Sequence, residues 1–159
     1  MKEERNIENC PDEAKGRNRF SKEERLHHRS LVEGLFRLGK SFYEFPFRVT
    51  WREMSLEALE KNFRNQVPEG IGKLQMMVVV PKKKRKRAVD RVLMRRRIRE
   101  AYRLNRHSLR DQIADTPEIA TVSLSLIYIH NENLEYSRVE EKVVNLLGRL
   151  QTKLKQEEA

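Results

Sequence analysis

Apolar residues along the chain recur at intervals that change between those of helices and those of strands. Between residues 31 and 38 they follow a helical spacing. Ser21 and Glu24 stand three apart, as in a capping box, which predicts that this helix begins at Ser21. Gly39 follows the last periodic residue and is expected to end the helix as a left-handed cap.

Three later segments have the patterns of strands. Apolar and other residues alternate from Phe45 to Trp51, and Pro46 indicates that this strand begins there or lies at an edge. A shorter strand is expected just before it, at residues 42–43. Residues 74–80 are continuously apolar, which favours a strand covered on both faces. Residues 121–129 are rich in alternating β-branched residues and form the last predicted strand.

The remaining segments are a long connection, a final helix and two polar ends. Residues 53–73 are interrupted by proline and glycines and are predicted to be a connection with room for a helical turn. Ser137 and Glu140 form a second capping box ahead of the last helix. One face of that helix carries the apolar side chains of Val139, Val143, Leu146, Leu147, Leu150 and Leu154. Residues 1–19 are expected to be a disordered extension, and residues 156–159 a short tail.

Helices interleaved with so few strands indicate one small sheet with helices packed on it. The predicted class is therefore α+β, with a single domain over residues 20–155.

Composition narrows the setting of this domain. The chain has 159 residues, and Cys10 is its only cysteine, so no disulfide can form within the chain. No segment approaches the roughly 20 consecutive apolar residues that span a bilayer. The first residues also lack the apolar core of a signal peptide. A reducing, cytoplasmic location is expected.

Positive charge is concentrated in one segment. Between Lys82 and Arg106 there are 13 lysines and arginines against two acids, a net charge of +11. The whole chain carries only +10, so the remainder is close to neutral. Such a distribution is typical of a surface that binds a polyanion.

The second half of this segment has the pattern of an amphipathic helix. On a helical wheel, Met94, Ile98, Ala101 and Tyr102 share one side, which is expected to pack on the sheet. The neighbouring side carries an arginine ridge made of Arg95, Arg99, Arg103 and Arg106, with Arg96 at its margin. Guanidinium groups on one face suit phosphate recognition.

Other interpretations of the basic segment are a disordered tail, a solvated helix face and a nuclear import signal in PKKKRKR. The helical register argues against a tail, and the charge density is unusual for a merely solvated face. The position between a strand and a packed helix argues against an import signal. No histidine has a carboxylate or cysteine at metal-ligand spacing, and no motif of a protein active site is found.

Several quoted motifs resemble a known family. R-A-V-D-R…R-R-x-I-R-E-A-Y-R is similar to the signature helix of the bacterial ribonuclease P protein component, and M-V-V-V-P-K-K to its third strand and Lys-rich turn. RFSKEERL…LFRLGKSFYEFPFRV resembles its first helix and strands, and SLIYIHNENLEYSRVEEKVVNLL its last strand and helix. The resemblance covers residues 20–155 and is closest to the Bacteroidetes-type branch.

The resemblance implies an αβββαβα sandwich with a left-handed βαβ crossover, the fold of ribosomal protein S5 domain 2. It implies a protein subunit of an endoribonuclease in which a catalytic RNA, with Mg²⁺ that no protein site holds, removes the 5′ leader of precursor tRNA. The protein would have no catalytic residue of its own, would be a monomer when free, and would bind both RNAs.

Residue by residue, the resemblance predicts two binding surfaces. Contacts to the catalytic RNA are expected from Lys82, Lys83, Lys84, Arg85, Lys86, Arg87, Arg91, Arg95, Arg96, Arg99 and Arg103. A cleft between the first helix and the sheet would hold the leader, with its surface formed by Phe36, Phe47, Val49 and Trp51. Aromatic residues beside a basic groove suit single-stranded RNA, because any base can stack on them.

The chain departs from the family at the start of the signature helix. The family has Arg-Asn-Arg there, whereas this chain has Arg91, Val92 and Leu93. Either the RNA partner has adapted, or affinity comes from the later arginines and the lysines. The alternatives to the family function are an RNA- or DNA-binding module without a catalytic partner, ribosomal or architectural, and a basic nuclease with its own site.

Overall fold

The computed structural model describes residues 19–158, so the extension predicted for residues 1–19 falls almost wholly outside the described residues. The elements in chain order are η2 (Lys22–Glu24, a 3-10 helix), α2 (Arg29–Leu38), β1 (Lys40–Glu44), β2 (Phe47–Met54), α3 (Leu56–Asn62), β3 (Leu74–Val79), α4 (Ala88–Asn105), α5 (His107–Ala114), β4 (Thr121–Tyr128) and α6 (Tyr136–Glu158).

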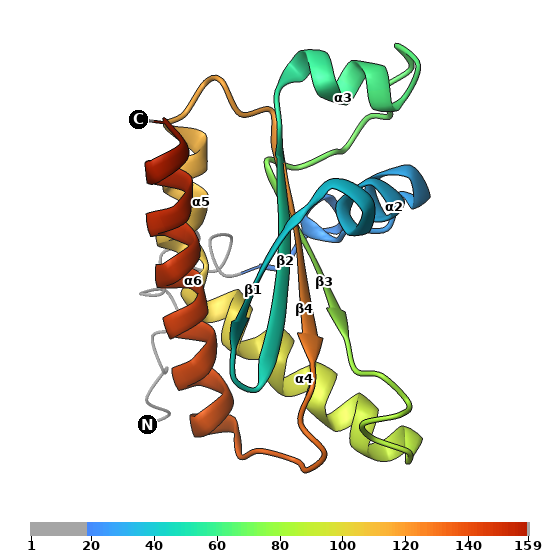
Figure 1. The fold of residues 1–159 in the computed structure, drawn as a ribbon, viewed down its shortest axis with the longest axis vertical. Coiled ribbons are helices and arrows are strands. Elements are labelled where there is room, and N and C mark those ends of the chain that lie inside the picture. The colour runs from blue at the N-terminus through green and yellow to red at the C-terminus, as the bar shows by residue number, and fades with distance from the viewer. Residues whose placement is uncertain (1–18, 159) are drawn as a thin grey trace, which may run out of the picture.

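The strands form one mixed sheet in the order β1-β2-β4-β3. β1 pairs antiparallel with β2, β2 antiparallel with β4, and β3 parallel with β4. The connection from β3 to β4 runs through α4 and α5 behind the sheet and is left-handed (Figure 1). This is the predicted αβββαβα order with two additional helices, α3 and α5.

The main core lies between one face of the sheet and helices α4, α5 and α6 (Figure 1). The predicted apolar sides of α4 and α6 are both buried in it, including Ile98 of α4 and Val143 of α6, which have no exposed surface. From the sheet, alternate residues of each strand enter the same core, because successive side chains of a strand point to opposite faces. This layer therefore follows directly from the apolar periodicity.

A second, smaller core lies on the other face of the sheet, under α2 and α3. It contains Leu31 and Leu35 of α2, Leu59 of α3 and Met54 of β2. Half-buried residues from the connection after α3 complete it. The predicted connection thus holds a helix of its own, and β2 is longer than expected because it continues to Met54.

The first helix begins later than predicted. Ser21 and Glu24 do form a capping pair, with the Ser21 amide donating to Glu24 Oε2 at 2.9 Å, but they close only the short η2 turn. The chain then becomes extended, and the Leu26 amide donates to the Met76 carbonyl oxygen of β3 at 3.1 Å. This pairing with the sheet edge interrupts the helix, and α2 starts at Arg29.

Gly39 does not adopt the predicted left-handed conformation, since its φ is −73°. Glycine is needed there for a different reason. A Cβ at this position would lie 2.2 Å from the Leu35 carbonyl oxygen and 3.1 Å from that of Trp51. The last turn of α2 therefore leaves room only for hydrogen, and the Trp51 carbonyl oxygen of β2 adds a second, less severe contact.

Four further features differ from what the sequence predicts. α5 was not expected, although Leu109 and Ile113 are buried in the main core. The last helix starts at Tyr136, so Ser137 lies inside it rather than capping it. β3 is fully buried only in its first half, because it forms an edge of the sheet. α6 extends to Glu158 in place of a tail, and no helix among residues 19–158 is both long and apolar enough to cross a membrane.

A buried ion pair joins the N-terminal segment to the end of α4. Arg106 Nε donates to Glu24 Oε1 at 2.6 Å and its Nη2 donates to Oε2 at 3.2 Å, while the Arg106 side chain has no exposed surface. Nη2 also donates to the Arg19 carbonyl oxygen at 2.8 Å. The helical wheel predicts that Arg106 lies on the arginine ridge. This prediction is wrong, because α4 ends at Asn105 and the wheel does not apply beyond that residue.

The ionisation of Glu24 reflects this environment. Burial by itself would raise the pKa of Glu24, but the hydrogen bond from Arg106, the Ser21 amide and the charges of Arg106 and Arg110 outweigh it and hold the pKa below 4.5. The pair therefore stabilises the fold at pH values above 4.5, and this stabilisation is lost as the pH falls through the lowered pKa.

We predict that Glu24→Gln lowers the free energy of unfolding by about 3–5 kcal/mol, because it leaves the Arg106 charge buried without a carboxylate. Urea denaturation at neutral pH measures the loss. Glu33→Gln is the matched control, since the Arg29–Glu33 pair is exposed by 91% and 65% and should contribute under about 1 kcal/mol. Equal effects of the two substitutions would contradict the prediction.

Candidate nucleic-acid interface

The cations of the basic segment divide into those held by other groups of the protein and those left unpaired. Side chains that donate hydrogen bonds or form ion pairs within the protein are Arg85, Arg91, Arg97, Arg103 and Arg106. Side chains with no such partner among residues 19–158 are Lys82, Lys83, Lys84, Lys86, Arg87, Arg95, Arg96 and Arg99. The unpaired set is the part of the prediction that the structure presents to a polyanion.

Two of the predicted RNA contacts instead build the frame of the Lys-rich loop (residues 82–87). Arg85 pairs with Asp90 at 3.0 Å, and Asn133 donates to the same carboxylate at 2.9 Å. Arg91 Nη1 donates to the carbonyl oxygens of Arg85 at 3.0 Å and Lys86 at 2.8 Å. These bonds tie the loop to the first turn of α4 and to the turn after β4.

The framed loop surrounds a hollow of about 520 Å³. The residues that line it are Lys83, Lys84, Arg85, Lys86, Arg87, Asp90 and Asn131. Because Asp90 is already engaged by Arg85 and Asn133, the lysines are displayed without a competing carboxylate. A fixed group of point charges suits contacts to a phosphate backbone irrespective of sequence.

On α4 itself, unpaired arginines crowd together. Burial lowers the pKa of Arg99, and the neighbouring charges of Arg95 and Arg25 lower it further. Arg25 comes from the segment between η2 and α2, so sequence analysis of α4 missed it. No local pattern indicates that Arg25 lies near α4, because its position depends on the extended segment in which Leu26 pairs with Met76. Like charges this close are best neutralised by a bound polyanion.

The departure from the family pattern lies on the same surface. Val92 is 38% exposed, while Leu93 is half-buried. The position that carries asparagine in the family is therefore accessible but cannot form a hydrogen bond here. The Lys-rich loop next to this position still presents unpaired cations.

The four residues predicted to form the leader cleft do not lie together. Phe47 and Val49 have no exposed surface and Trp51 has 2%, because all three point into the main core under α4 and α6. Phe36 is 49% exposed and lies on α2, across the sheet. A ring without exposed surface cannot stack on a base, so the three strand residues are corrected to core residues.

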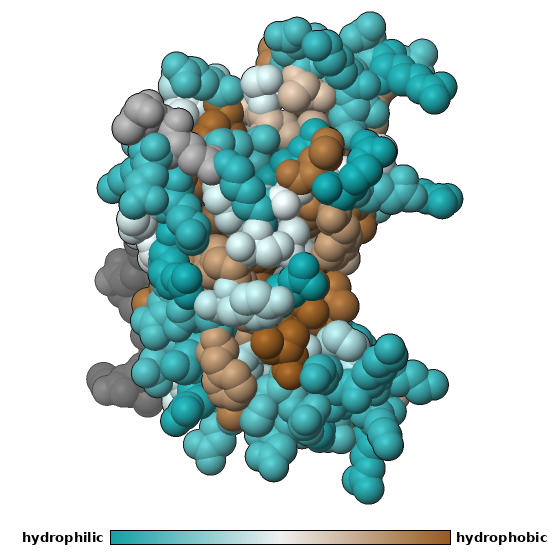
Figure 2. Space-filling view, in the orientation of Figure 1, coloured by the Kyte–Doolittle hydropathy of each residue, from teal (hydrophilic) through white to brown (hydrophobic). Residues whose placement is uncertain are grey.

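The face of the sheet that α4–α6 leave open carries the intervening residues of each strand. Strand register places Tyr43 opposite Arg48, Arg48 opposite Ile127, and Ile127 opposite Val79. We call these four residues the open row; Tyr43 is 64% exposed, Arg48 is exposed, and the other two are half-buried. Figure 2 shows apolar and neutral surface over this part of the sheet, between hydrophilic surfaces of α2 and α3 on one side and of α4 and its loop on the other.

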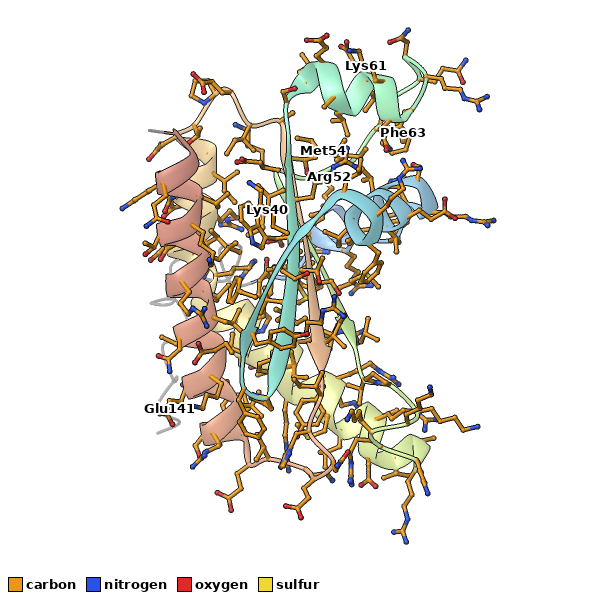
Figure 3. The ribbon with its side chains drawn as sticks, in the orientation of Figure 1. Lys40, Arg52, Met54, Lys61, Phe63 and Glu141 are labelled. Carbon is orange, nitrogen blue, oxygen red and sulfur yellow. The ribbon has the colours of Figure 1, made fainter. Side chains whose placement is uncertain are left out.

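Phe36 is an exposed residue of α2, the helix that packs on this face of the sheet. Gly34 lies against Arg52 and Asn62, since a Cβ there would be 2.3 Å from the Arg52 guanidinium and 3.6 Å from the Asn62 amide oxygen. One flank of α2 is thus occupied by β2 and α3, and Figure 3 shows Arg52 and Met54 on that side of the strand. Phe36 is about 160° away around the helix, on the flank that faces the uncovered rows.

On the same face of the sheet, the strand residues next to the open row are polar and buried. Thr50 and Ser125 are buried and face each other across β2 and β4, and Ser41 lies within 3.3 Å of the Thr50 hydroxyl. The Oγ of Ser125 has no hydrogen-bond partner among the residues that the structure describes. Such short hydroxyl residues leave space between α2 and the sheet. Polar residues at alternate positions of β2 and β4 were the available signal for which face is open.

Among residues 19–158 no three His, Cys, Asp or Glu side chains gather as a group that could hold a metal ion. The arrangement presents unpaired cations, an exposed phenylalanine and tyrosine, and an apolar strand row. These are the components of a single-strand or mixed RNA-binding surface.

Comparison with known proteins points to one family. The model of the family described as Ribonuclease P matches residues 20–151. Ribonuclease P protein components from two strains of Porphyromonas gingivalis are each 34% identical over 108 residues, covering 68% of this chain and 70% of the relative. Porphyromonas belongs to the Bacteroidetes, the branch expected from the sequence.

Solved structures agree on the fold. The RNase P protein from Thermotoga maritima superposes with a TM-score of 0.53 at 24% identity, covering 79% of this chain and 96% of that chain. The same protein in complex with 1-(4-fluorophenyl)-2-thiourea gives the same TM-score and identity, with 98% of that chain covered.

Arg95→Ala and Arg99→Ala are each predicted to weaken RNA binding and to reduce the slope of log affinity against log salt concentration by about one unit. Titrations of the ribonuclease P RNA from the same organism over a salt series measure both quantities. Arg138→Ala, an exposed arginine on α6, is the matched control and should leave the slope unchanged. Equal slopes for all three variants would show that the α4 arginines face solvent in the complex.

Proposed function

The chain belongs to the ribonuclease P protein family, and from this premise we propose which of its surfaces binds each of two RNAs. α4 and the Lys-rich loop bind the catalytic RNA, and the open row with Phe36 holds the single-stranded 5′ leader of precursor tRNA. The observation that carries the proposal is the position of the open row, which is accessible, partly aromatic and adjacent to unpaired cations.

The two surfaces differ in the chemistry of their contacts. Lysines held on a fixed loop and arginines spaced along one helix face suit the regularly placed phosphates of a folded RNA. The open row offers one guanidinium, one phenol ring and two aliphatic side chains, which suit an unpaired strand whose bases are exposed. Because every base has an aromatic face, such contacts tolerate different leader sequences.

In this proposal Mg²⁺ is bound by the RNA subunit and not by the protein. The bond cleaved is a phosphodiester, and Mg²⁺ held by the RNA subunit would activate the attacking water and stabilise the leaving oxygen. The protein contributes positive charge that lowers the amount of Mg²⁺ needed to bring two RNAs together. We further propose that the free protein is a monomer, because its large apolar surfaces are packed inside the main and the smaller core.

The first test is cleavage of precursor tRNA by the cognate RNA, with and without the protein. At low magnesium we expect the protein to increase the rate, and the gain should grow with leader length until the open row is filled. If the protein changes neither the rate nor its dependence on leader length, the proposed function fails. Binding of unrelated structured RNAs with equal affinity would favour an architectural RNA-binding module instead.

A second test concerns the open row. Phe36→Ala should lower affinity for precursor tRNA with a leader by about fivefold or more, because one stacking contact is lost. Mature tRNA without a leader should bind the variant and the parent protein equally. Val144→Ala, which removes a 45% exposed apolar side chain from α6, is the control and should change neither affinity. An equal loss for both tRNAs would place Phe36 outside the leader site.

A further inference from the structure

A second hollow lies at the outer edge of β3 and shares Arg99 with the α4 surface described above. Its volume is about 330 Å³, within the range of ordinary ligand pockets. The residues that line it come from the η2–α2 segment, from β3 and from α4: Phe20, Arg25, Leu26, His27, Met76, Met77, Val78 and Arg99. No part of the proposed leader or catalytic-RNA contacts accounts for this combination.

The rim of the hollow is cationic and has no internal counter-ion. Arg25 and Arg99 both line it; burial lowers the pKa of Arg99, and the charges of Arg95 and Arg25 lower it further. None of the three has a carboxylate partner in the described part of the chain. Two guanidinium forks at one opening can bind a phosphate bidentately from both sides.

The floor of the hollow is apolar and includes a flexible thioether side chain. Val78 supplies aliphatic surface on the α4 side of β3 and Met77 supplies thioether surface on the other side of the strand edge, while Met76 is almost fully buried. Thioethers make favourable contacts with aromatic rings. The His27 ring is held in place, since its Nδ1 lies 2.9 Å from the Arg25 carbonyl oxygen and its ring centroid 4.3 Å from that of His28. Phe20 lies between Arg25 and Tyr102, with its ring centroid 5.9 Å from the Tyr102 ring. A flat aromatic ligand fits these walls.

The hollow also continues the open row. Val79 ends the row on β3, and its neighbours Met77 and Val78 line the hollow. Within residues 19–158 the Arg25–Met76 bridge is the pairing found on the outer edge of β3, so the strand edge beyond Met76 is uncovered. A strand of RNA crossing the sheet from Tyr43 to Val79 would reach the hollow next.

We infer that this hollow binds one nucleotide of a single-stranded RNA, with its base against Met77 and His27 and its phosphate between Arg25 and Arg99. The inference rests on the proposed function, because it extends the path of the strand held on the open row. It adds a discrete site for a single base at the β3 edge, formed in part by a segment outside the signature helix.

The test uses the full chain and a short single-stranded oligoadenylate RNA, compared with the same ribose-phosphate oligomer lacking bases. Fluorescence anisotropy gives the affinities. Arg25→Gln should weaken oligoadenylate binding about fivefold and lower the salt slope by about one unit. His27→Ala should weaken oligoadenylate binding by a similar factor but leave the abasic oligomer unaffected. Arg138→Gln, with the same change of charge on α6, should leave both affinities within about twofold.

Methionine oxidation gives an independent readout without substitution. Met77 is half-buried and accessible, whereas Met76, Met54 and Met94 are buried. Bound oligoadenylate should slow the oxidation of Met77 by hydrogen peroxide, as measured by mass spectrometry of its peptide, and the abasic oligomer should not. Unchanged circular dichroism would show that each variant is folded.

Several outcomes would overturn the inference. The first is that Arg25→Gln binds oligoadenylate as Arg138→Gln does. The second is that Met77 oxidises equally fast with and without oligoadenylate. The third is that duplex RNA protects Met77 from oxidation as well as oligoadenylate does. In each case a retained leader-length dependence and a retained Phe36→Ala effect would leave the proposed function standing. Loss of leader-length dependence together with normal Met77 protection would instead overturn the proposed function alone.

Discussion

The binding surfaces of this protein depend on one buried ion pair, Glu24–Arg106. The pair joins residues 82 positions apart and is closed by a further bond from Arg106 to the backbone of Arg19. It holds the segment before α2 against the end of α4, so that Leu26 can pair with Met76 at the sheet edge. The position of α2 over the sheet follows from this anchor together with the packing of Leu31 and Leu35 in the smaller core.

Burying such a pair is costly, and it stabilises only because both ions are fully hydrogen-bonded. An apolar pair could fill the same space, but it would not select a single register for an extended segment. Directional bonds from one guanidinium to two carboxylate oxygens and a carbonyl oxygen do so. The same residue type thus has two roles here, since Arg106 is neutralised within the fold while Arg95 and Arg99 are left for RNA.

Much of the architecture could be predicted from residue patterns. Buried Ile98 and Val143 lie where helical periodicity placed them, and the Lys-rich loop lies between a strand and a helix as expected. The wrong predictions are those in which one local sequence pattern is compatible with more than one structure. The Ser21–Glu24 pair caps a turn rather than a long helix, because the chain then becomes extended and Leu26 pairs with Met76. Gly39 is required by its close contact with the Leu35 carbonyl oxygen at the end of α2 and not by its backbone angle.

The sequence by itself determined that one segment carries the whole net charge, and that Phe47, Val49 and Trp51 share the apolar side of β2 opposite Arg48. It could not decide whether helices cover that apolar side or whether it borders a binding cleft, because the covering helices lie far away in the chain. Only the packing of α4 and α6 assigned Phe47, Val49 and Trp51 to the core and left Arg48 on the open face. In the same way, charge counting located the cations, but only tertiary contacts decided which are paired. Partners such as Glu24 and Leu134 are far away in the chain, so no local pattern could identify them.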